Sequence, residues 1–346
     1  MAFRNLLSAR PLSACLLLLV VCQEGALGAL GAPAIRRMSD VAAFLLHVDT
    51  TLTVDEAVKW IDDHHPKTDN TTREFRLAHA TQAVETRNNY RYAADVPLNM
   101  YEDYVLPYTT FDEQPEAWRT QFAKILAPFL NKDMSAKEAA TSIQENIWTA
   151  FGEPPISFKS NQTPQVLSPS DVLSKRYGSC TGLSIFLVDA FRSCGLPARV
   201  VGTAEWNRPE GGNHNWPEVW FDNQWNFIDP GPGNATWNEA WFVEIASKAV
   251  ARTKNGIYAA MTWLPDQADS TYIGEWRTPS IYFPALEVTS HYAEAGRFPL
   301  NNWGVHTHQV PLAAIPVLLM VAGAAGFFLY PLLKRPELAA PECHRP

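Results

Sequence analysis

Three residues in the middle of the chain have the types and the order of a thiol-based acyl-transfer site: Cys180, His214 and Asp229. A cysteine attacks a carbonyl carbon as its thiolate, so its free pKa of about 8.5 must be lowered for attack at neutral pH. The amides at a helix N-terminus and a neighbouring imidazolium both lower it. A carboxylate can hold the imidazole in the required tautomer. We therefore predict Cys180 as nucleophile, His214 as base and Asp229 as the residue that orients the base.

The segment after Cys180 has the pattern of a buried helix. Its apolar residues recur at helical spacing and are Leu183, Phe186, Leu187, Ala190, Phe191 and Cys194. Gly195 and Pro197 follow, a combination typical of a helix end. Cys180 is thus expected at the N-terminal end of a helix, and Cys194 is expected to be a core residue.

His214 and Asp229 fall on two predicted strands joined by a tight turn. Residues 213–221 alternate in character, Asp222-Asn223 suits a two-residue turn, and residues 224–229 return. With that turn Phe221 pairs with Gln224, which places Asp229 diagonal to His214 on the same face, roughly 7 Å away. A three-residue turn would place Asp229 on the other face, and a four-residue turn would move it further off. Pro217 within the first strand suggests an edge strand or a bulge.

An acyl-transfer site also needs donors for the oxyanion that forms during attack. The backbone N–H of Cys180 is the natural first donor. Gln144 and Trp148 lie one turn apart on a predicted helix at 135–151, whose start carries the capping box Ser135 and Glu138. Either side chain could supply the second donor, and either could equally be a surface or core residue.

Both ends of the chain predict a secreted protein that is held in a membrane. Residues 1–28 combine basic residues, a short apolar run and small residues, as in a signal peptide, although an uncleaved anchor remains an alternative. Residues 310–333 lack formal charge and could cross a hydrocarbon core of about 30 Å, with Lys334 and Arg335 placing the tail 334–346 in the cytoplasm. A cleaved lipid-anchor signal is the other alternative for this end. We predict a single-pass type I membrane protein with an extracellular or luminal ectodomain.

An extracellular or luminal location has consequences for asparagine glycosylation and for the state of the cysteines. Acceptor sequons for N-glycosylation occur at Asn70, Asn161 and Asn234. The predicted ectodomain keeps only Cys180 and Cys194, which are about 21 Å apart along one helix and therefore too distant for a disulfide. A free thiol in an oxidising compartment calls for a reason, and catalysis is one.

Composition excludes several partners. The net charge of −8, without any long basic run, argues against a nucleic-acid partner. The histidines lack metal-ligand spacing and no calcium-binding loop is present, so no metal or cofactor is expected. The expected partners are a protein or peptide substrate, and the membrane through residues 310–333.

The regions before and after the predicted catalytic core carry no chemical motif and are described by their expected secondary structure alone. Residues 36–134 are expected to form a helical region, and residues 236–309 a mixed α/β extension of the ectodomain. The individual expectations are helices over 54–63, 72–87, 114–130 and 237–252, and strand-like pieces over 256–263 and 282–289.

The motifs R-x-G-x-C-T-G, G-L-P-A-R-V-V-G, H-N-W-P-E-V-W and F-I-D-P resemble those of the transglutaminase-like superfamily, which is related to papain-like thiol enzymes. The resemblance spans roughly residues 135–232, and we assign the core to 135–235. It implies an α+β fold in which the nucleophile helix packs on an antiparallel sheet, and it implies catalytic roles for Cys180, His214 and Asp229.

The expected function is cysteine-dependent acyl transfer or hydrolysis on amide bonds of proteins or peptides, through a thioester. The sequence leaves peptidase, transglutaminase and deglycosylating amidase open, because pocket shape and the acyl acceptor decide among them. The alternative from another class is a catalytically silent binding or scaffold module at the membrane.

Overall fold

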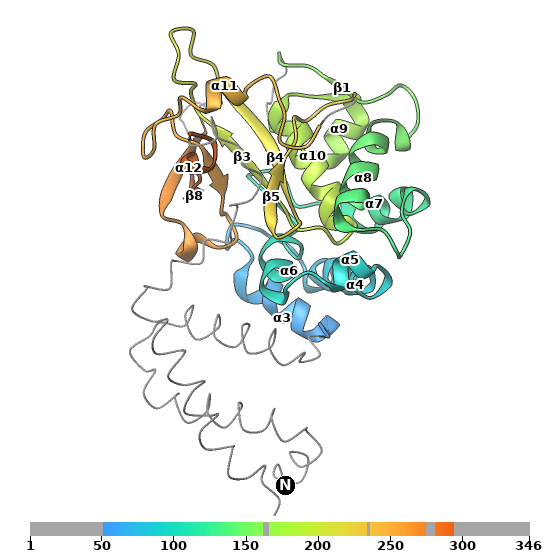
Figure 1. Ribbon diagram of the computed structural model, residues 1–346. Coiled ribbons are helices and arrows are strands. Elements are labelled where there is room, and N and C mark those ends of the chain that lie inside the picture. The colour runs from blue at the N-terminus through green and yellow to red at the C-terminus, as the bar shows by residue number, and fades with distance from the viewer. Residues whose placement is uncertain (1–50, 162–165, 234–235, 275–280, 294–346) are drawn as a thin grey trace, which may run out of the picture. The chain divides into compact units, whose positions relative to one another are not determined.

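The computed structural model describes residues 51–161, 166–233, 236–274 and 281–293 (Figure 1). The chain divides into two units, 1–301 and 302–346, and every described residue belongs to the first. The predicted signal peptide, membrane span and cytoplasmic tail lie outside the described residues. Within the described ranges, no helix combines the length and the apolar character that a membrane crossing requires.

Helices dominate the described part of the chain before Cys180. They are α3 (Val54–His64), α4 (Arg73–Asn89), α5 (Arg91–Ala94), α6 (Leu98–Tyr104), α7 (Trp118–Leu126), α8 (Ala136–Ala150) and α9 (Pro169–Lys175). The predicted capping box is present at α8, where Ser135 and Glu138 bond reciprocally. The helix predicted over 114–130 was too long at both ends, because α7 begins only at Trp118 and a 3₁₀ turn (Ala127–Phe129) follows it. Pro115 disfavours a helical conformation for Gln114, the first residue of the predicted range.

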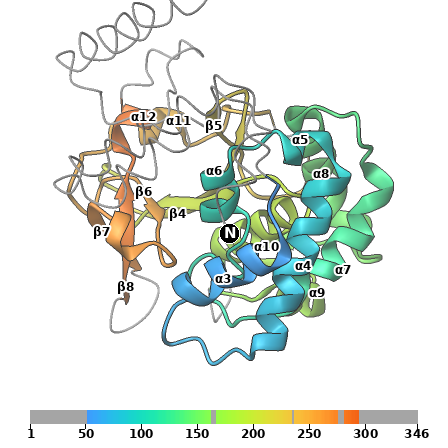
Figure 2. The ribbon, with the colours of Figure 1, turned by 90° about the horizontal axis from the view of Figure 1, so that it is seen from below.

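Six antiparallel strands form the main sheet in the order β5-β4-β3-β6-β8-β7. They are β3 (Ala198–Thr203), β4 (His214–Phe221), β5 (Gln224–Phe227), β6 (Tyr258–Ala260), β7 (Ser270–Gly274) and β8 (Ile281–Glu287). Helices α7 to α9 and α10 (Cys180–Ser193) lie on one side of β3 to β5, and the short helices α11 (Val243–Ala246) and α12 (Thr289–Ala293) lie on the other (Figure 1). Figure 2 shows the same division from below, with β6 to β8 opposite α4, α7 and α8. The predicted α+β class with an antiparallel sheet is confirmed.

The β4–β5 hairpin has the predicted register. Asp222 and Asn223 both take positive φ, 54° and 58°, as a two-residue type I′ turn requires, and Phe221 pairs with Gln224. The expectation that Pro217 marks an edge or a bulge is wrong, because β4 is paired on both sides by β3 and β5. The Pro217 carbonyl accepts from Ile228 N–H at 3.2 Å, beyond the last paired residue of β5. The backbone N–H that Pro217 lacks would therefore point toward residue 228, just beyond the last β4–β5 pair, so the proline interrupts no regular pairing within the sheet.

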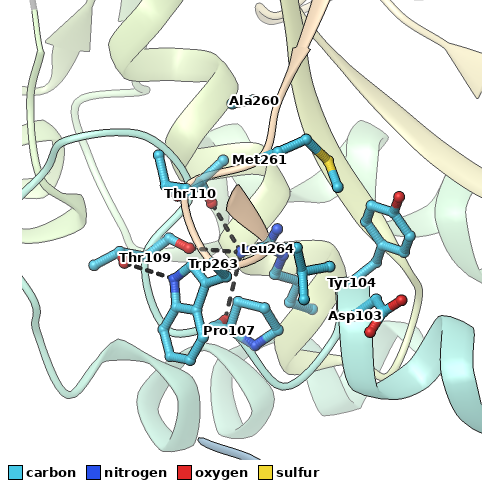
Figure 3. A pocket seen from close by; sticks show the side chains of 11 residues that line it. Asp103, Tyr104, Pro107, Thr109, Thr110, Ala260, Met261, Trp263 and Leu264 are labelled. Atoms are coloured by element: carbon cyan, nitrogen blue, oxygen red, sulfur yellow. Dashed lines mark hydrogen bonds between the residues drawn. The ribbon is translucent and has the colours of Figure 1, made fainter. Parts of the chain in front are cut away.

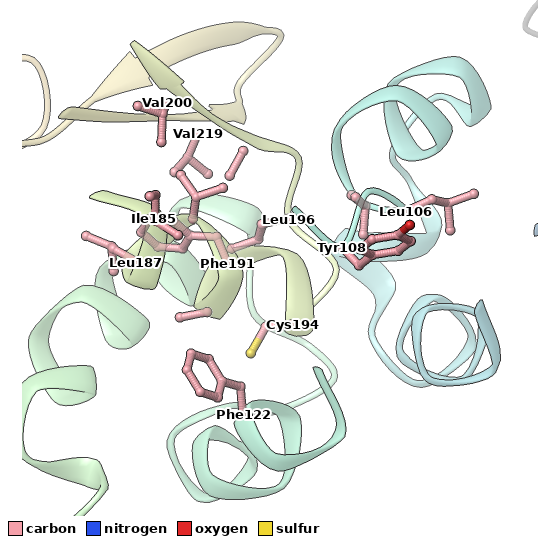
Figure 4. Packing of buried hydrophobic residues seen from close by; sticks show 14 of the residues in the cluster. Leu106, Tyr108, Phe122, Ile185, Leu187, Phe191, Cys194, Leu196, Val200 and Val219 are labelled. Atoms are coloured by element: carbon pink, nitrogen blue, oxygen red, sulfur yellow. The ribbon is translucent and has the colours of Figure 1, made fainter. Parts of the chain in front are cut away.

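Helix α10 (Cys180–Ser193), which begins at the predicted nucleophile, runs through the larger hydrophobic core. Every residue from Thr181 to Ser193 is buried, and its apolar side chains pack between the sheet and α7 (Figure 4). Phe186 and Phe122 meet edge to face with ring centroids 5.0 Å apart. Cys194 is 1% exposed, and burial raises the pKa of its thiol to about 12. Its prediction as a core residue is confirmed.

Two buried arginines join the N-terminal helices to the end of α10. Arg192 Nη1 donates to the carbonyl of Thr109 and to Oγ1 of Thr110, both at 3.0 Å, beside a small cavity (Figure 3). Arg119 donates to the Val105 carbonyl at 2.7 Å and to the Arg192 carbonyl at 3.0 Å. Because these groups are buried, each bond satisfies an oxygen atom that water does not reach. The N-terminal region is therefore part of the platform that supports α10.

The helix predicted over 237–252 was wrong: only the single turn of α11 forms there. Asn238 has a positive φ of 64°, and its side chain accepts from Phe227 N–H at 3.0 Å and donates to Asn226 at 2.9 Å. These bonds to the end of β5 hold the chain out of a helical path. Helical spacing of apolar residues is a local signal, and here a tertiary contact overrides it.

Gly195, which ends α10, gives the first testable prediction. Its φ is 82°, and a Cβ there would meet Ala93 Cβ at 2.7 Å and Thr86 Cγ2 at 3.0 Å. Gly195→Ala should lower the free energy of unfolding by about 2–4 kcal/mol through backbone strain and overpacking. Gly211→Ala is the matched control, because φ is 60° there and the nearest atom would be 3.8 Å away. Urea unfolding at constant m measures both, and equal losses would contradict the packing explanation.

Candidate active site

Cys180 is the first residue of α10, directly after the N-cap Ser179. The preceding segment is held by a short parallel pair, β1 (Ser157–Phe158) with β2 (Tyr177–Gly178). Cys180 is half-buried and not in a disulfide. The thiol therefore lies where the helix dipole favours its anionic form.

His214 begins β4 and contacts the thiol of Cys180 through a hydrogen bond. The neighbouring pair reinforces this contact, since Asn215 Nδ2 donates to Thr181 Oγ1 at 2.8 Å. The bond is buried and ties the first residues of β4 to the first turn of α10. The hydrogen bond thus joins β4 to α10 through the residues that directly follow His214 and Cys180.

Asp229 lies just after β5 and completes the set. His214 Nε2 donates to Asp229 Oδ1 at 2.7 Å, and the side chains are 7% and 34% exposed respectively. This bond leaves Nδ1 as the imidazole nitrogen available to the thiol. The structure therefore brings together the three residues that the sequence singled out. Asp229 was predicted on the returning strand, but β5 ends at Phe227, and Asp229 meets His214 from the segment that follows.

Trp241 is a site residue that the sequence did not indicate. Its Nε1 donates to Asp229 Oδ2 at 3.0 Å, so both oxygens of the carboxylate have a partner. Its ring is 56% exposed and its centroid is 5.1 Å from that of His214. Only the aromatic richness of the 236–309 region could have hinted at this role.

The electrostatics favour an ion pair between thiolate and imidazolium. Burial alone would raise the pKa of Cys180, but its hydrogen bond with His214 and the charge of that ring bring the pKa below its ordinary value. Burial alone would lower the pKa of His214, but hydrogen bonds with Asp229 and Cys180 raise it to about 9. Each charge stabilises the other, which is the arrangement an activated cysteine needs.

The two candidates for the second oxyanion donor differ in their surroundings, although both lie on α8. Gln144 directs Nε2 to the carbonyls of Gly231 and Gly233, each at 3.5 Å, and so supports the loop after Asp229. Trp148 is 3% exposed, and its indole N–H has no hydrogen-bond partner among the described residues. The carbonyl of Trp148 accepts from Ile156 N–H at 2.8 Å, next to the β1–β2 pair that leads to Cys180. The free buried donor makes Trp148 the better candidate.

An open cleft of about 540 Å³ lies beside Asp229. It is lined by residues 229–233 together with Thr236, Glu239 and Ala240. Its lining includes Gly231 and Gly233, which Gln144 contacts, so the cleft opens beside the carboxylate that accepts from His214.

The remaining predicted sites are less central. Asn70 and Asn161 are exposed in loops, while Asn234 lies outside the described residues. Across the described part of the chain, no three histidine, cysteine, aspartate or glutamate side chains converge in a way that could hold a metal ion.

Comparison with known families matches one part of the chain. Residues 123–230 match the family model of the Transglutaminase-like superfamily, a range that contains the three converging residues and both oxyanion candidates. The mixed α+β architecture described above is consistent with such a core. No curated protein matches the chain.

Solved structures give weaker likenesses. A "putative cysteine protease" from Cytophaga hutchinsonii is 14% identical with a TM-score of 0.30, over 44% of this chain and 57% of that one. A TGase is 18% identical with a TM-score of 0.18, over 54% of this chain and 41% of that one. The chain therefore spans only part of the length of either protein, and TM-scores this low establish no shared overall fold.

Proposed function

We propose that the protein is a cysteine-dependent enzyme that transfers or hydrolyses acyl groups at amide bonds of proteins or peptides. The observation that carries this proposal is the chain of contacts from the Cys180 thiol through His214 to Asp229 Oδ1, with 2.7 Å at the last step. A buried hydrophobe in place of a nucleophile would need neither an imidazole partner nor a carboxylate behind that partner.

The chemistry follows from the positions of these groups. The Cys180 thiolate adds to the amide carbonyl carbon, and the electron pair of the C=O bond moves to oxygen. His214 then gives its proton to the departing nitrogen as the C–N bond breaks, which leaves a thioester on Cys180. Neutral His214 next takes a proton from water or from an amine as it attacks the thioester, and the Cys180 thiolate leaves. Water gives hydrolysis, and an amine gives acyl transfer.

The oxyanion formed in both steps needs donors that are already in place. The first-turn backbone N–H of Cys180 is one, and we assign the second to Trp148 rather than Gln144. The unpartnered buried indole N–H supports this choice, because such a group costs free energy unless a ligand satisfies it.

We further propose that this chemistry takes place outside the cytoplasm, on a protein anchored by residues 310–333. The exposed sequons at Asn70 and Asn161 are compatible with a glycosylated ectodomain. The exposed indole of Trp241 beside His214 supports a macromolecular substrate with apolar side chains near the reacting amide.

The pH dependence of alkylation tests the proposal. Iodoacetamide should label Cys180 readily at about pH 6, well below the ordinary thiol pKa of about 8.5, because His214 stabilises the thiolate. Turnover of an amide substrate should fall as pH rises through about 9, where His214 loses the proton that it must donate. Mass analysis of the Cys180 peptide measures labelling, and buried Cys194 provides the internal control.

The pH at which labelling of Cys180 begins can also contradict the proposal. If labelling of Cys180 in the folded protein begins only near the ordinary thiol pKa, the thiol is not activated. The proposed function would then be wrong, and the silent binding module would be the better account.

A further inference from the structure

Four aromatic rings surround the imidazole of His214, and we call them the ring cage: Trp206, Trp216, Trp241 and Phe242. Their centroids lie 5.1 Å (Trp241), 5.1 Å (Phe242), 5.8 Å (Trp216) and 6.4 Å (Trp206) from the imidazole centroid. Trp216 stacks on Phe242 at 4.5 Å and on Trp206 at 6.0 Å. Three of these four rings, Trp241, Phe242 and Trp216, lie within about 6 Å of the imidazole, so their packing restricts the orientation of its plane.

Trp216 connects this cage to the last described helix, α12. It is fully buried, and its Nε1 donates to the hydroxyl of Tyr292 at 2.7 Å. The Tyr292 ring packs edge-on against Trp216 with centroids 5.3 Å apart. A buried indole N–H needs a partner, so this bond selects one orientation of the Trp216 ring.

The Tyr292 hydroxyl is itself held from the other side. It donates to Glu218 Oε1 at 2.6 Å, and Glu218 Oε2 accepts from Arg199 Nε at 2.7 Å. Arg199 lies 4.0 Å above the ring of Trp225, and both members of the ion pair are 2% exposed. Burial and the Glu218 carboxylate raise the pKa of Tyr292 well above its ordinary value, so the hydroxyl keeps the proton that it donates.

His214, Trp216 and Glu218 alternate along β4 and therefore share one face of the strand. The contacts from Tyr292 to His214 thus run along a single face of β4.

We propose that Tyr292 is a positioning residue for the acyl-transfer chemistry: its hydroxyl fixes Trp216, and Trp216 as a wall of the ring cage keeps the His214 imidazole directed at Cys180 and Asp229. This inference rests on the proposed function and goes beyond it. It assigns the C-terminal part of the described chain, outside the residues that match the family model, a role in the reaction.

The test compares Tyr292→Phe with wild type and with Tyr101→Phe. Tyr101 is a matched control, because its hydroxyl is also buried and donates at 2.7 Å, but to the Ala83 carbonyl among the N-terminal helices. The measured quantity is the iodoacetamide labelling rate of Cys180 between about pH 5 and about pH 10. The ionisable side chain that faces the thiol is His214, and the Asp229 carboxylate lies behind that ring.

Tyr292→Phe should label Cys180 about tenfold more slowly than wild type at about pH 6, the effect of a thiol pKa raised by about one unit. The two rates should converge at about pH 10, where the thiolate forms without help from His214. Tyr101→Phe should follow wild type at every pH. A merely structural loss would instead change the rate at high pH, or would affect both variants alike.

A second variant guards against a folding defect in the first. Trp216→Phe removes the same hydrogen bond from its other end, and it should shift the labelling profile in the same direction. The double variant should shift the labelling profile little more than either single variant, because both substitutions remove the same Trp216–Tyr292 hydrogen bond. Unchanged profiles in both variants, or fully additive shifts, would overturn the positioning role. If wild type itself shows no labelling at low pH, the proposed function fails instead, so the two failures are distinguishable.

Discussion

Cys180→Ala is expected to abolish formation of the acyl-enzyme and to lower turnover by about 10⁴-fold or more, because no other described group can form the thioester. The measurement offers a panel of peptide amides to the purified ectodomain, including peptides with glutamine and with glycosylated asparagine. Intact mass detects the thioester on wild type, and ammonia or amine release gives turnover. The member of the panel that acylates Cys180 also identifies the class of amide bond.

Cys194→Ala is the matched control for this change. It removes a thiol from the same helix, but one that is buried in the core with a pKa raised to about 12. It should keep the acyl-enzyme and the turnover of wild type while losing some stability. If Cys180→Ala keeps the wild-type biological effect on a cell surface, catalysis is not the function, and the scaffold alternative gains support.

Asp229→Asn is expected to lower turnover by about 10³- to 10⁴-fold with little change in KM. The amide preserves the size of the side chain but removes the charge that accepts from His214 Nε2 at 2.7 Å. The imidazole then loses the partner that selects its tautomer. Because Asp229 raises the pKa of His214, the fall in turnover that we expect for wild type near pH 9 should move to lower pH in this variant.

A pH–rate profile of kcat for the variant measures this shift. Asp222→Asn is the control, since it makes the same chemical change at the exposed tip of the same hairpin. It should leave the rate and the profile as in wild type. Equal effects of the two substitutions would show that the hairpin, rather than the His214–Asp229 bond, determines activity.

Local patterns predicted the elements that carry the site. The apolar spacing after Cys180 predicted α10, because a buried helix must repeat its apolar face about every turn. Asp222-Asn223 predicted the hairpin and its register, because both residues tolerate the positive φ of a type I′ turn. Two predictions failed where non-local contacts were decisive. The helix predicted over 237–252 does not form, because Asn238 bonds to the end of β5. Pro217 lies inside the sheet, because the N–H that it lacks would face the end of β5.

Local patterns were enough to predict which residues converge: a cysteine at a helix start, a histidine on a strand and an aspartate on the far side of the hairpin turn. Those positions follow from periodicity and turn chemistry, which act over a few residues. The surroundings of the three residues depend instead on contacts between distant segments. The bonds of Trp241 to Asp229 and of Tyr292 to Trp216 join residues distant in sequence, and no local pattern encodes such pairs. The choice of Trp148 over Gln144 likewise depended on which buried donor lacks a partner, a property of packing rather than of residue type.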